Sequence, residues 1–349
     1  MLRGAVVGLG NVAVHGHLPG WLSRRDVEIV AVTDVDPARR AAGAERLPAA
    51  RWYDSAALMM AEAELDFVDI CTPPSSHAGL IRAALERGLH VLCEKPLVGS
   101  LDELRSLADL AAAADRALHT VHNWHHAPIV KEVRTLVSGG AVGRVTAASW
   151  QTLRTRPAAS AGGAAENWRL DPAIAGGGVL TDHGWHVSYI LQRWLGATPL
   201  AVGARLETRR HTRWPVEDTA SLRLRFPEAV ADVLLTWAAD ERRNWARLEG
   251  SEGVLDIADD VLMLRREGGE RRWSFTSGLS DGSQHPEWFH GVADQFLARV
   301  TDRAGDADNL AEATACLAVE ALARASSRQG GRELPLGAEA VLTRPELSV

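Results

Sequence analysis

A glycine-rich turn between an apolar run and a helical pattern constrains this chain more than any other feature. The run Leu2–Val7 leads into Gly8-Leu9-Gly10-Asn11-Val12-Ala13, which fits the G-x-G-x-x-G/A pattern of dinucleotide-binding turns. The first glycine permits a tight turn, the second lets the backbone approach a pyrophosphate, and a small sixth residue permits close helix–strand packing. A helix that begins there points its free N–H groups at the phosphates. The predicted cofactor contacts in this turn are Gly8, Gly10, Asn11 and Val12.

Strands and helices alternate over the first 122 residues. Short apolar runs occur at residues 2–7, 28–33, 65–71, 90–93 and 117–121, with helical patterns between them. Such alternation is typical of a parallel sheet covered by helices on both faces. We therefore predict an α/β fold that begins with a Rossmann doubly wound parallel sheet over residues 1–122.

The pattern changes after residue 122. Helical patterns at 128–138 and 179–195 are followed by strand-like segments in close succession between residues 200 and 275, and then by helices at 287–301 and 309–327. Hairpin-type turns separate several of these strands. A chain of 349 residues is too long for one ordinary core. We expect a second α/β domain, residues 123–349, with a mostly antiparallel sheet.

Residues after the next strands refine the predicted cofactor. Asp34 ends the second strand, where an acidic residue hydrogen-bonds the ribose hydroxyls and repels a 2′-phosphate, which favours NAD over NADP. Arg39 and Arg40 could still admit a phosphate, so NADP stays open. Thr72 and Pro73 follow the third strand at the carboxyl edge of the sheet, where ligands of open α/β folds bind.

Composition excludes several classes of protein. Apolar residues make up 46% and charged residues 24% of the chain, and the net charge is −7, so nothing supports a sequence-independent nucleic-acid binder. No stretch reaches the roughly 18 apolar residues of a membrane span. The start runs directly into a strand without a signal-peptide core, which predicts a cytoplasmic protein. The three cysteines are scattered, which argues against a disulfide framework or zinc knuckle.

Lysine is rare in this chain. Of its 38 basic residues only Lys95 and Lys131 are lysine, and the rest are arginine. Because a lysine can give up its proton and an arginine cannot, a lysine in such a background suggests a chemical need for one. Lys95 follows a predicted strand within Glu94-Lys95-Pro96.

Several motifs in order resemble the Gfo/Idh/MocA family of oxidoreductases. After the glycine turn come Thr72–His77, Glu94–Pro96, Trp168-Arg169 and Gly176–His186, which match the family's T-P-x-x-x-H, E-K-P, W-R and G-G-G-x-L-x-D-x-G-x-H patterns. The resemblance implies reversible hydride transfer between a nicotinamide and a sugar or cyclitol carbinol. It also implies a second-domain sheet that mediates homo-oligomerisation, as a dimer or tetramer.

Carried over by position, the resemblance assigns a catalytic set of Lys95, Asp182 and His186. It adds His77, Glu94 and Pro96 to the cofactor contacts. Alcohol oxidation needs a base for the hydroxyl proton while hydride leaves the carbon. Asp182 and His186 are four residues apart on a predicted helix and so share a face. We favour His186 as the base and Lys95 as the polariser of the oxygen, and the opposite assignment stays open.

Candidate substrate contacts lie near these motifs. They are Asn123, Trp124, His125, Trp168, Arg169 and His183. His125 stands where many relatives have an arginine, which puts substrate recognition at that loop in doubt. Several histidines cluster in sequence, but the acidic partners and spacing of a zinc motif are missing, so no metal site is predicted.

Three functions follow from this pattern. The first is an NAD(P)-dependent dehydrogenase or ketoreductase acting on a sugar, glycoside or cyclitol. The alternatives are a non-catalytic dinucleotide-sensing regulator and a redox-assisted glycoside-cleaving enzyme. The intact trio of ionisable residues favours an enzyme, because a pure sensor has no need of it.

Overall fold

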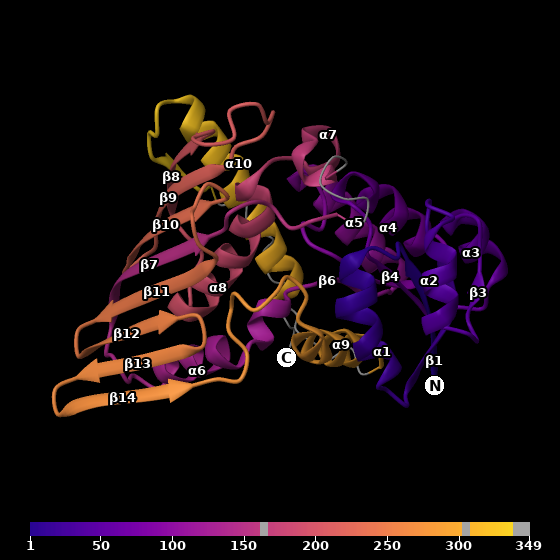
Figure 1. The fold of residues 1–349 in the computed structure, drawn as a ribbon, viewed down its shortest axis with the longest axis horizontal. Helices are drawn as coiled ribbons and strands as arrows, with labels where there is room; N and C mark the ends of the chain where they lie inside the picture. The colour runs from indigo at the N-terminus through magenta and orange to yellow at the C-terminus, as the bar shows by residue number, and fades with distance from the viewer. Residues whose placement is uncertain (161–166, 302–307, 338–349) are drawn as a thin grey trace. The chain divides into compact units, whose positions relative to one another are not determined.

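The computed structural model describes residues 1–160, 167–301 and 308–337, which cluster into two compact units (Figure 1). The first unit comprises Met1–Asn123, Ala159–Trp168 and Ser283–Leu310. The second comprises Trp124–Ala158, Arg169–Gly282 and Ala311–Val349. The chain therefore passes from one unit to the other several times.

The first unit is built on a six-stranded parallel sheet with the order β3-β2-β1-β4-β5-β6. This confirms the predicted Rossmann sheet. Its strands are β1 (Leu2–Val7), β2 (Val27–Thr33), β3 (Arg51–Trp52), β4 (Phe67–Ile70), β5 (His90–Cys93) and β6 (Leu118–Thr120). Its helices are η1 (Ala13–His17), α1 (Leu18–Leu22), α2 (Arg39–Arg46), α3 (Ala56–Glu62), η2 (Pro74–Ser76), α4 (His77–Leu85), α5 (Leu101–Ala114) and α9 (Pro286–Thr301).

The helix after the glycine turn is not a regular α-helix. Residues 13–17 form a π-helical turn, in which the N–H of Leu18 donates to the carbonyl of Ala13. Pro19 follows, and a proline has no N–H to donate to the preceding turn. Single π turns of this kind are rare and concentrate at functional sites. The wide turn carries His17, which is buried.

Helix α9 packs in the first unit although it lies more than 160 residues after β6. The Phe289 ring lies 5.2 Å from the Trp21 ring, and the Phe296 ring lies 5.4 Å from the Phe67 ring. All four side chains are almost fully buried. A single boundary between residues 122 and 123 assigns α9 to the second domain, whereas its aromatic face completes the core under the first sheet.

The second unit contains a nine-stranded sheet with the order β14-β13-β12-β11-β7-β10-β9-β8-β15. It is antiparallel apart from the β7–β10 pair, as predicted. Its strands are β7 (Val145–Leu153), β8 (Ala201–Glu207), β9 (Thr219–Arg225), β10 (Val230–Thr236), β11 (Arg243–Gly250), β12 (Gly253–Ala258), β13 (Val261–Arg266), β14 (Gly269–Ser274) and β15 (Leu334–Pro335). The accompanying helices are η3 (Asn123–His126), α6 (Pro128–Ser138), η5 (Trp168–Leu170), α7 (Pro172–Ala175), η6 (Leu180–Gly184), α8 (Trp185–Leu195) and α10 (Asn309–Arg328).

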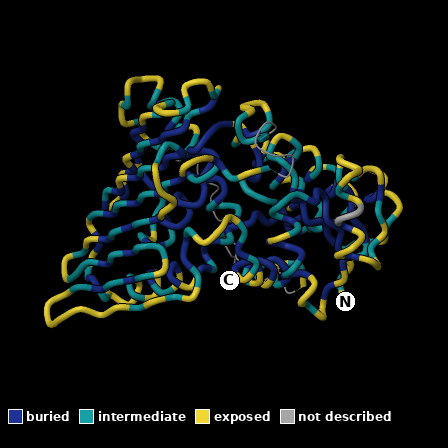
Figure 2. The backbone as a smooth tube through the Cα atoms, viewed as in Figure 1, coloured by how far each residue is buried: buried dark blue, intermediate teal, exposed yellow. Residues whose placement is uncertain are grey.

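Strand β7 lies between β11 and β10 in this sheet, and the sequence pattern does not predict it. Its inward side chains are Ala148, Trp150 and Thr152, and the residues that alternate with them over 147–153 are half-buried. Small and polar residues on both faces give a weak alternation, so the pattern escapes notice. Figure 2 shows the alternation of buried and half-buried residues along the strands of this sheet.

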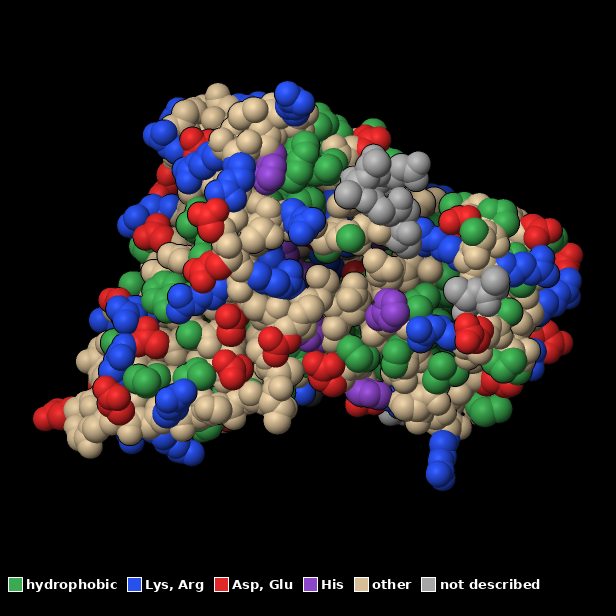
Figure 3. Space-filling model, viewed as in Figure 1, with side chains coloured by type: hydrophobic (Ala, Val, Ile, Leu, Met, Phe, Trp, Pro, Cys, Tyr) green, Lys and Arg blue, Asp and Glu red, His purple; other side chains and the backbone are tan. Residues whose placement is uncertain are grey.

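The surface of each unit carries both signs of charge. On the face shown in Figure 3, acidic and basic side chains are interspersed and do not gather by sign. Among the helices in the described ranges, none combines the length and apolar character that a membrane crossing requires.

The contact between β1 and β4 generates a stability prediction. A Cβ added at Gly4 would lie 2.3 Å from Cζ of Phe67, so the buried ring would have to move. We expect Gly4→Ala to lower the free energy of unfolding by about 1–3 kcal/mol, as overpacked cores do. Urea denaturation followed by circular dichroism measures this change.

Gly79 supplies the matched control. It is exposed in α4, and an added Cβ there meets nothing within 4 Å. Gly79→Ala should therefore be neutral or stabilising by up to about 1 kcal/mol, because alanine is the better helix former. Equal destabilisation by both variants would contradict the packing argument.

Candidate active site

The glycine turn has the geometry that its sequence predicts. Gly8 has a φ of +91°, and a Cβ there would lie 3.0 Å from the carbonyl oxygen of Cys71. Only glycine tolerates both the conformation and the contact. At Gly10 an added Cβ would meet one atom within 4 Å, Nη1 of Arg39 at 3.3 Å. Apart from this flexible guanidinium, no atom within 4 Å crowds the Gly10 backbone on that side.

Asp34 links the end of β2 to this turn. Its Oδ2 accepts a hydrogen bond from the N–H of Leu9 at 2.6 Å, and its Oδ1 accepts one from the N–H of Asp36 at 2.8 Å. Nη1 of Arg39 lies 3.5 Å from the same Oδ2. The predicted ribose-binding carboxylate and the arginine that could accept a phosphate therefore lie side by side.

His77 joins the two loops that follow β4 and β5. It is fully buried, with Nε2 2.8 Å from the carbonyl oxygen of Thr72 and Nδ1 2.9 Å from that of Pro96. The Lys95–Pro96 peptide bond is cis. The His77 side chain therefore bridges the two loops that carry the predicted cofactor contacts.

The Glu94 carboxylate contacts both the backbone of Lys95 and the side chain of His17. Its Oε2 accepts the backbone N–H of Lys95 at 3.0 Å, and its Oε1 lies 3.0 Å from Nε2 of His17. Burial raises the pKa of Glu94, but the hydrogen bond and charge of His17 and the charge of Lys95 outweigh it, so the pKa of Glu94 lies below its ordinary value. Glu94 is therefore an ionised, anchored group.

These residues fit a dinucleotide. A glycine turn with an open side, a helical segment starting at Asn11 and an acidic residue after β2 are the features that hold a pyrophosphate and a ribose in such folds. Asn11 donates from Nδ2 to the carbonyl oxygen of Ala159 at 3.2 Å. Gly8, Gly10, Val12 and Asp34 would hold the cofactor on this side, and the predicted contacts of the loops after β4 and β5, among them Thr72, Pro73 and Pro96, would line the other.

In the second unit, Asp182 lies on η6, a π-helical turn that leads directly into α8. Its Oδ1 is 3.8 Å from Nε of Arg169, and its Oδ2 is 3.6 Å from Nε2 of His183. The segment was predicted as a continuous helix from Val179 to Leu195. The structure confirms the helix, but its first turn is π-helical.

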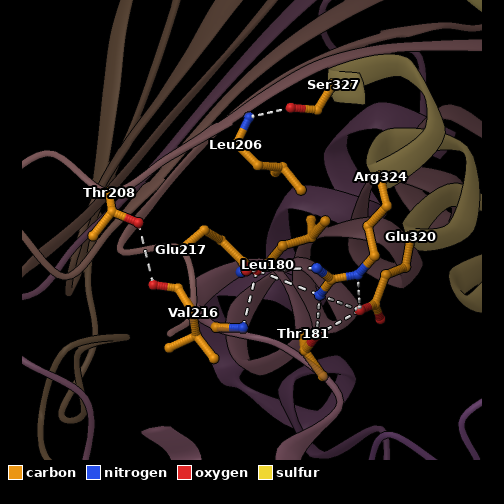
Figure 4. A network of polar contacts seen from close by, with 10 residues as sticks. Leu180, Thr181, Leu206, Thr208, Val216, Glu217, Glu320, Arg324 and Ser327 are labelled. Carbon is orange, nitrogen blue, oxygen red and sulfur yellow. Dashed lines mark hydrogen bonds and ion pairs between the residues drawn. The ribbon is translucent and has the colours of Figure 1, made fainter. Parts of the chain in front are cut away.

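A polar network fastens the start of η6 (Figure 4). The Oε1 of Glu217 accepts the N–H groups of Gly178 at 3.0 Å and Leu180 at 3.3 Å. Arg324 from α10 lies 3.4 Å from this carboxylate and donates to Oγ1 of Thr181 at 2.7 Å. Glu217 and Arg324 thus hold the backbone just before Asp182. A Cβ at Gly178 would lie 2.0 Å from the Glu217 carbonyl oxygen, so this close approach needs glycine.

His186 lies one turn further on, at the start of α8. Its ring stacks on Trp124 with centroids 4.8 Å apart, and its Nδ1 lies 2.8 Å from Oη of Tyr189. The same Oη accepts the backbone N–H of Trp124 at 3.2 Å. Trp124 and Tyr189 therefore fix the plane and the rotation of the imidazole.

His125 joins the same layer of side chains. Its ring centroid lies 4.4 Å from that of Tyr189, and its Nε2 lies 3.0 Å from Oε2 of Glu312. The other oxygen of Glu312 accepts from Nε of Arg193 at 2.7 Å. The residue in the arginine-like position thus pairs with a carboxylate on α10.

The structure brings some predicted site residues together within one unit. Asp182 contacts Arg169 and His183, and His186 contacts Trp124. Asn123, Trp168 and Lys95 belong to the first unit. The joint catalytic role of Lys95, Asp182 and His186 stays a prediction, as do the individual cofactor and substrate contacts.

The residues that orient the predicted ones are not among the sequence-based predictions. They are His17, Asp69, Tyr189, Glu217, Glu312, Glu320 and Arg324. Tyr189 is three residues after His186 on one helix, a spacing that could have indicated it. The others approach from distant parts of the chain and carry no local signal.

Two family models match the chain. Residues 2–122 match the oxidoreductase family with an NAD-binding Rossmann fold, and residues 130–256 match the GFO/IDH/MocA C-terminal domain. The chain belongs to the GFO/IDH/MocA family. As a member of this family, it is an oxidoreductase whose first domain binds NAD, as the ordered motifs indicated.

Individual relatives agree with this family. The chain is 27% identical over 272 residues to a D-apiose dehydrogenase of Paraburkholderia graminis, covering 75% of this chain and 68% of that one. It is 32% identical over 188 residues to the D-glucoside 3-dehydrogenase of Escherichia coli, covering 53% and 52%. An oxidoreductase from Agrobacterium radiobacter, solved with NAD+, L-tartaric acid and magnesium, shares the fold with a TM-score of 0.84 at 22% identity, over 97% of this chain and 99% of that one.

The anchor beneath η6 generates a second prediction. Glu217→Gln removes the charge that faces Arg324 and weakens the acceptor of two backbone N–H groups. We expect the free energy of unfolding to fall by about 2 kcal/mol, because a largely buried guanidinium loses a partner. Urea denaturation measures it.

Asp232→Asn is the matched control. Asp232 pairs with Arg223 at 3.2 Å on the outer surface of the same sheet, with both side chains more than half exposed. Exposed pairs contribute little, so this variant should change the free energy by less than about 1 kcal/mol. A Glu217→Gln variant as stable as Asp232→Asn would show that the network does not hold η6.

Proposed function

We propose that this protein is an NAD-dependent dehydrogenase or ketoreductase, with NADP as a possible second cofactor. It transfers a hydride between the nicotinamide and a CH–OH or ketone carbon of a sugar, glycoside or cyclitol. The observation that carries the proposal is that Lys95, Asp182 and His186 are all present in a chain of this family. Relatives that are dehydrogenases of D-apiose and D-glucosides support the substrate class.

The three ionisable residues take separate roles in this proposal. A bound nicotinamide supplies the hydride acceptor when an alcohol is oxidised. His186 then takes the hydroxyl proton, and Lys95 donates a hydrogen bond to the developing alkoxide. Asp182, beside Arg169 and His183, stabilises positive charge at the site.

Tyr189 decides which nitrogen of His186 exchanges the proton. For Nε2 to accept a proton, Nδ1 must carry its own hydrogen. Oη of Tyr189, 2.8 Å away, is placed to accept that hydrogen. We therefore assign proton exchange with the substrate to Nε2, and the orientation of the ring to Tyr189 and Trp124.

The contacts of Asp34 support NAD as the preferred cofactor. Two backbone N–H groups fix its carboxylate at the glycine turn, where its charge opposes a 2′-phosphate. Arg39, 3.5 Å from that carboxylate, offers a positive group of the kind that accepts such a phosphate. We propose that NADP supports turnover with a lower kcat/KM than NAD does.

A polyol and sugar screen with NAD and NADP in parallel tests the function. We expect reduction of NAD, seen at 340 nm, with at least one sugar, glycoside or cyclitol. Lys95→Ala should lower kcat by roughly 100-fold or more, the size of a lost acid–base or electrostatic group, while tryptophan fluorescence still reports dinucleotide binding.

Lys131→Ala is the control for this substitution, because it removes the other lysine from an exposed position on α6. It should leave kcat unchanged. Full turnover by Lys95→Ala, or tight dinucleotide binding without turnover of any substrate, would contradict the proposal.

We also propose that the protein is a cytoplasmic homo-oligomer, a dimer or tetramer that associates through the outer face of the nine-stranded sheet. Trp245, Gln151 and Leu234 are cross-strand neighbours on that face and are half-buried. Three buried free cysteines are compatible with a reducing compartment.

Light scattering of the purified protein tests the association. The mass should be a multiple of the chain mass at micromolar concentration. Trp245→Glu should shift it towards the monomer, because a charge at the centre of an apolar contact is costly to bury, whereas Leu200→Glu, at an exposed site before β8, should not. A monomer mass for the unaltered protein would refute this part.

A further inference from the structure

A buried histidine in the first unit lies between two carboxylates. His17 is 2% exposed; its Nδ1 lies 2.9 Å from Oδ2 of Asp69 and its Nε2 lies 3.0 Å from Oε1 of Glu94. Ionised carboxylates only accept hydrogen bonds, so each ring nitrogen must carry a hydrogen to be satisfied. Between two ionised carboxylates, this geometry favours the imidazolium.

The surroundings of His17 support the charged form. Burial lowers its pKa, but the charge and hydrogen bond of Asp69 outweigh it, so the pKa lies well above the ordinary 6.5. The Cys71 thiol lies 3.2 Å from Nδ1, and burial raises its pKa to about 12, which keeps it neutral. Trp21 on α1 donates to Asp69 at 2.7 Å, and the Phe289 ring on α9 stacks on His17 at 4.1 Å.

Glu94 connects His17 to Lys95. Glu94 accepts from His17 through one oxygen and from the backbone N–H of Lys95 through the other. Positive charges on His17 and Lys95 balance negative charges on Asp69 and Glu94. Loss of the imidazolium would leave the buried carboxylates of Asp69 and Glu94 without the cation that lies between them, which is a costly arrangement.

We propose that His17 is a positioning residue for Lys95. Its imidazolium fixes the Glu94 carboxylate against the Asp69 side chain of β4, and Glu94 fixes the backbone of Lys95 at the end of β5. Residues 13–17, directly after the glycine turn, form a π-helical turn. This wider turn directs the His17 side chain inward. A single helical segment thereby serves both the cofactor turn and the lysine.

The expected effect on kcat rests on the proposed catalytic role of Lys95. The contacts by which His17 positions Lys95 do not depend on that role. His17 itself does no chemistry on the substrate, because it is enclosed by Asp69, Glu94, Trp21 and Phe289. Its effect should appear in the state of Lys95 and in kcat, and the affinity for the dinucleotide should change little.

The scarcity of lysine makes Lys95 directly observable. With 13C at lysine Cε, the full-length protein should give two resonances, one from Lys95 and one from Lys131. In His17→Gln the Lys95 resonance should move and that of Lys131 should not. Alongside this, kcat should fall about tenfold or more, as misplacement of a catalytic group predicts, while the dinucleotide Kd stays within about threefold.

Two further variants separate positioning from packing. Phe289→Leu removes the ring that stacks on His17 but leaves both carboxylates, so it should leave the Lys95 resonance in place despite some loss of stability. Glu94→Gln keeps the side-chain shape and removes the charge, so it should move the Lys95 resonance as His17→Gln does. The double variant should lose no more kcat than either single one, because both break the same chain of contacts.

The pH dependence of unfolding gives an independent readout. Because folding raises the pKa of His17, its contribution is fully present below pH 6.5 and is lost as the pH rises through the folded-state value. The stability advantage of the unaltered protein over His17→Gln should therefore be larger at pH 6 than at pH 9.

The Lys95 resonance distinguishes failure of the positioning role from failure of the catalytic role. An unmoved Lys95 signal in both His17→Gln and Glu94→Gln, or an equal shift in Phe289→Leu, would overturn the positioning role. A moved signal with unchanged turnover would leave the positioning role standing and refute the catalytic role of Lys95.

Discussion

The parallel alignment of β1, β2, β4 and β5 is the constraint on which the rest of the first unit depends. Parallel strands end at one edge of their sheet, so the residues that follow them must meet there. Gly8, Asp34, Thr72 and Glu94 each follow one of these strands. The backbone contact of Gly8 with Cys71, and the bond from Leu9 to Asp34, show how closely the loops are joined. A binding edge for a dinucleotide follows from topology before any side chain is considered.

In the second unit, a loop of the sheet fixes the position where η6 begins. The loop before β9 carries Glu217, which holds the N–H groups of Gly178 and Leu180 where the π-helical turn begins. One turn later, α8 presents His186 to Trp124 and Tyr189. Polar groups that would otherwise lack partners at a helix start are thus satisfied by a carboxylate. The same contact sets the direction of the predicted catalytic residues.

Much of this organisation could be predicted from the sequence, and the remainder shows where local patterns fail. The glycine turn, the alternating strands and the hairpins of the second sheet have short-range signals, and the structure confirms them. Strand β7 has small and polar residues that hide its period. Three other contacts join residues far apart in the chain: α9 against the first sheet, His17 with Asp69 on β4, and His125 with Glu312. No spacing rule reports such contacts, and the ordered motifs identified the predicted site without the residues that orient it.

The packing of α9 has a consequence for how this protein can be divided. Phe289 and Phe296 cover His17, Trp21 and Phe67, so a fragment that stops at residue 122 would expose that aromatic layer to water. The nucleotide-binding unit is contiguous in space but not along the gene. Exchange of this unit between relatives therefore requires three separate segments to be moved together, with the intervening sheet left in place.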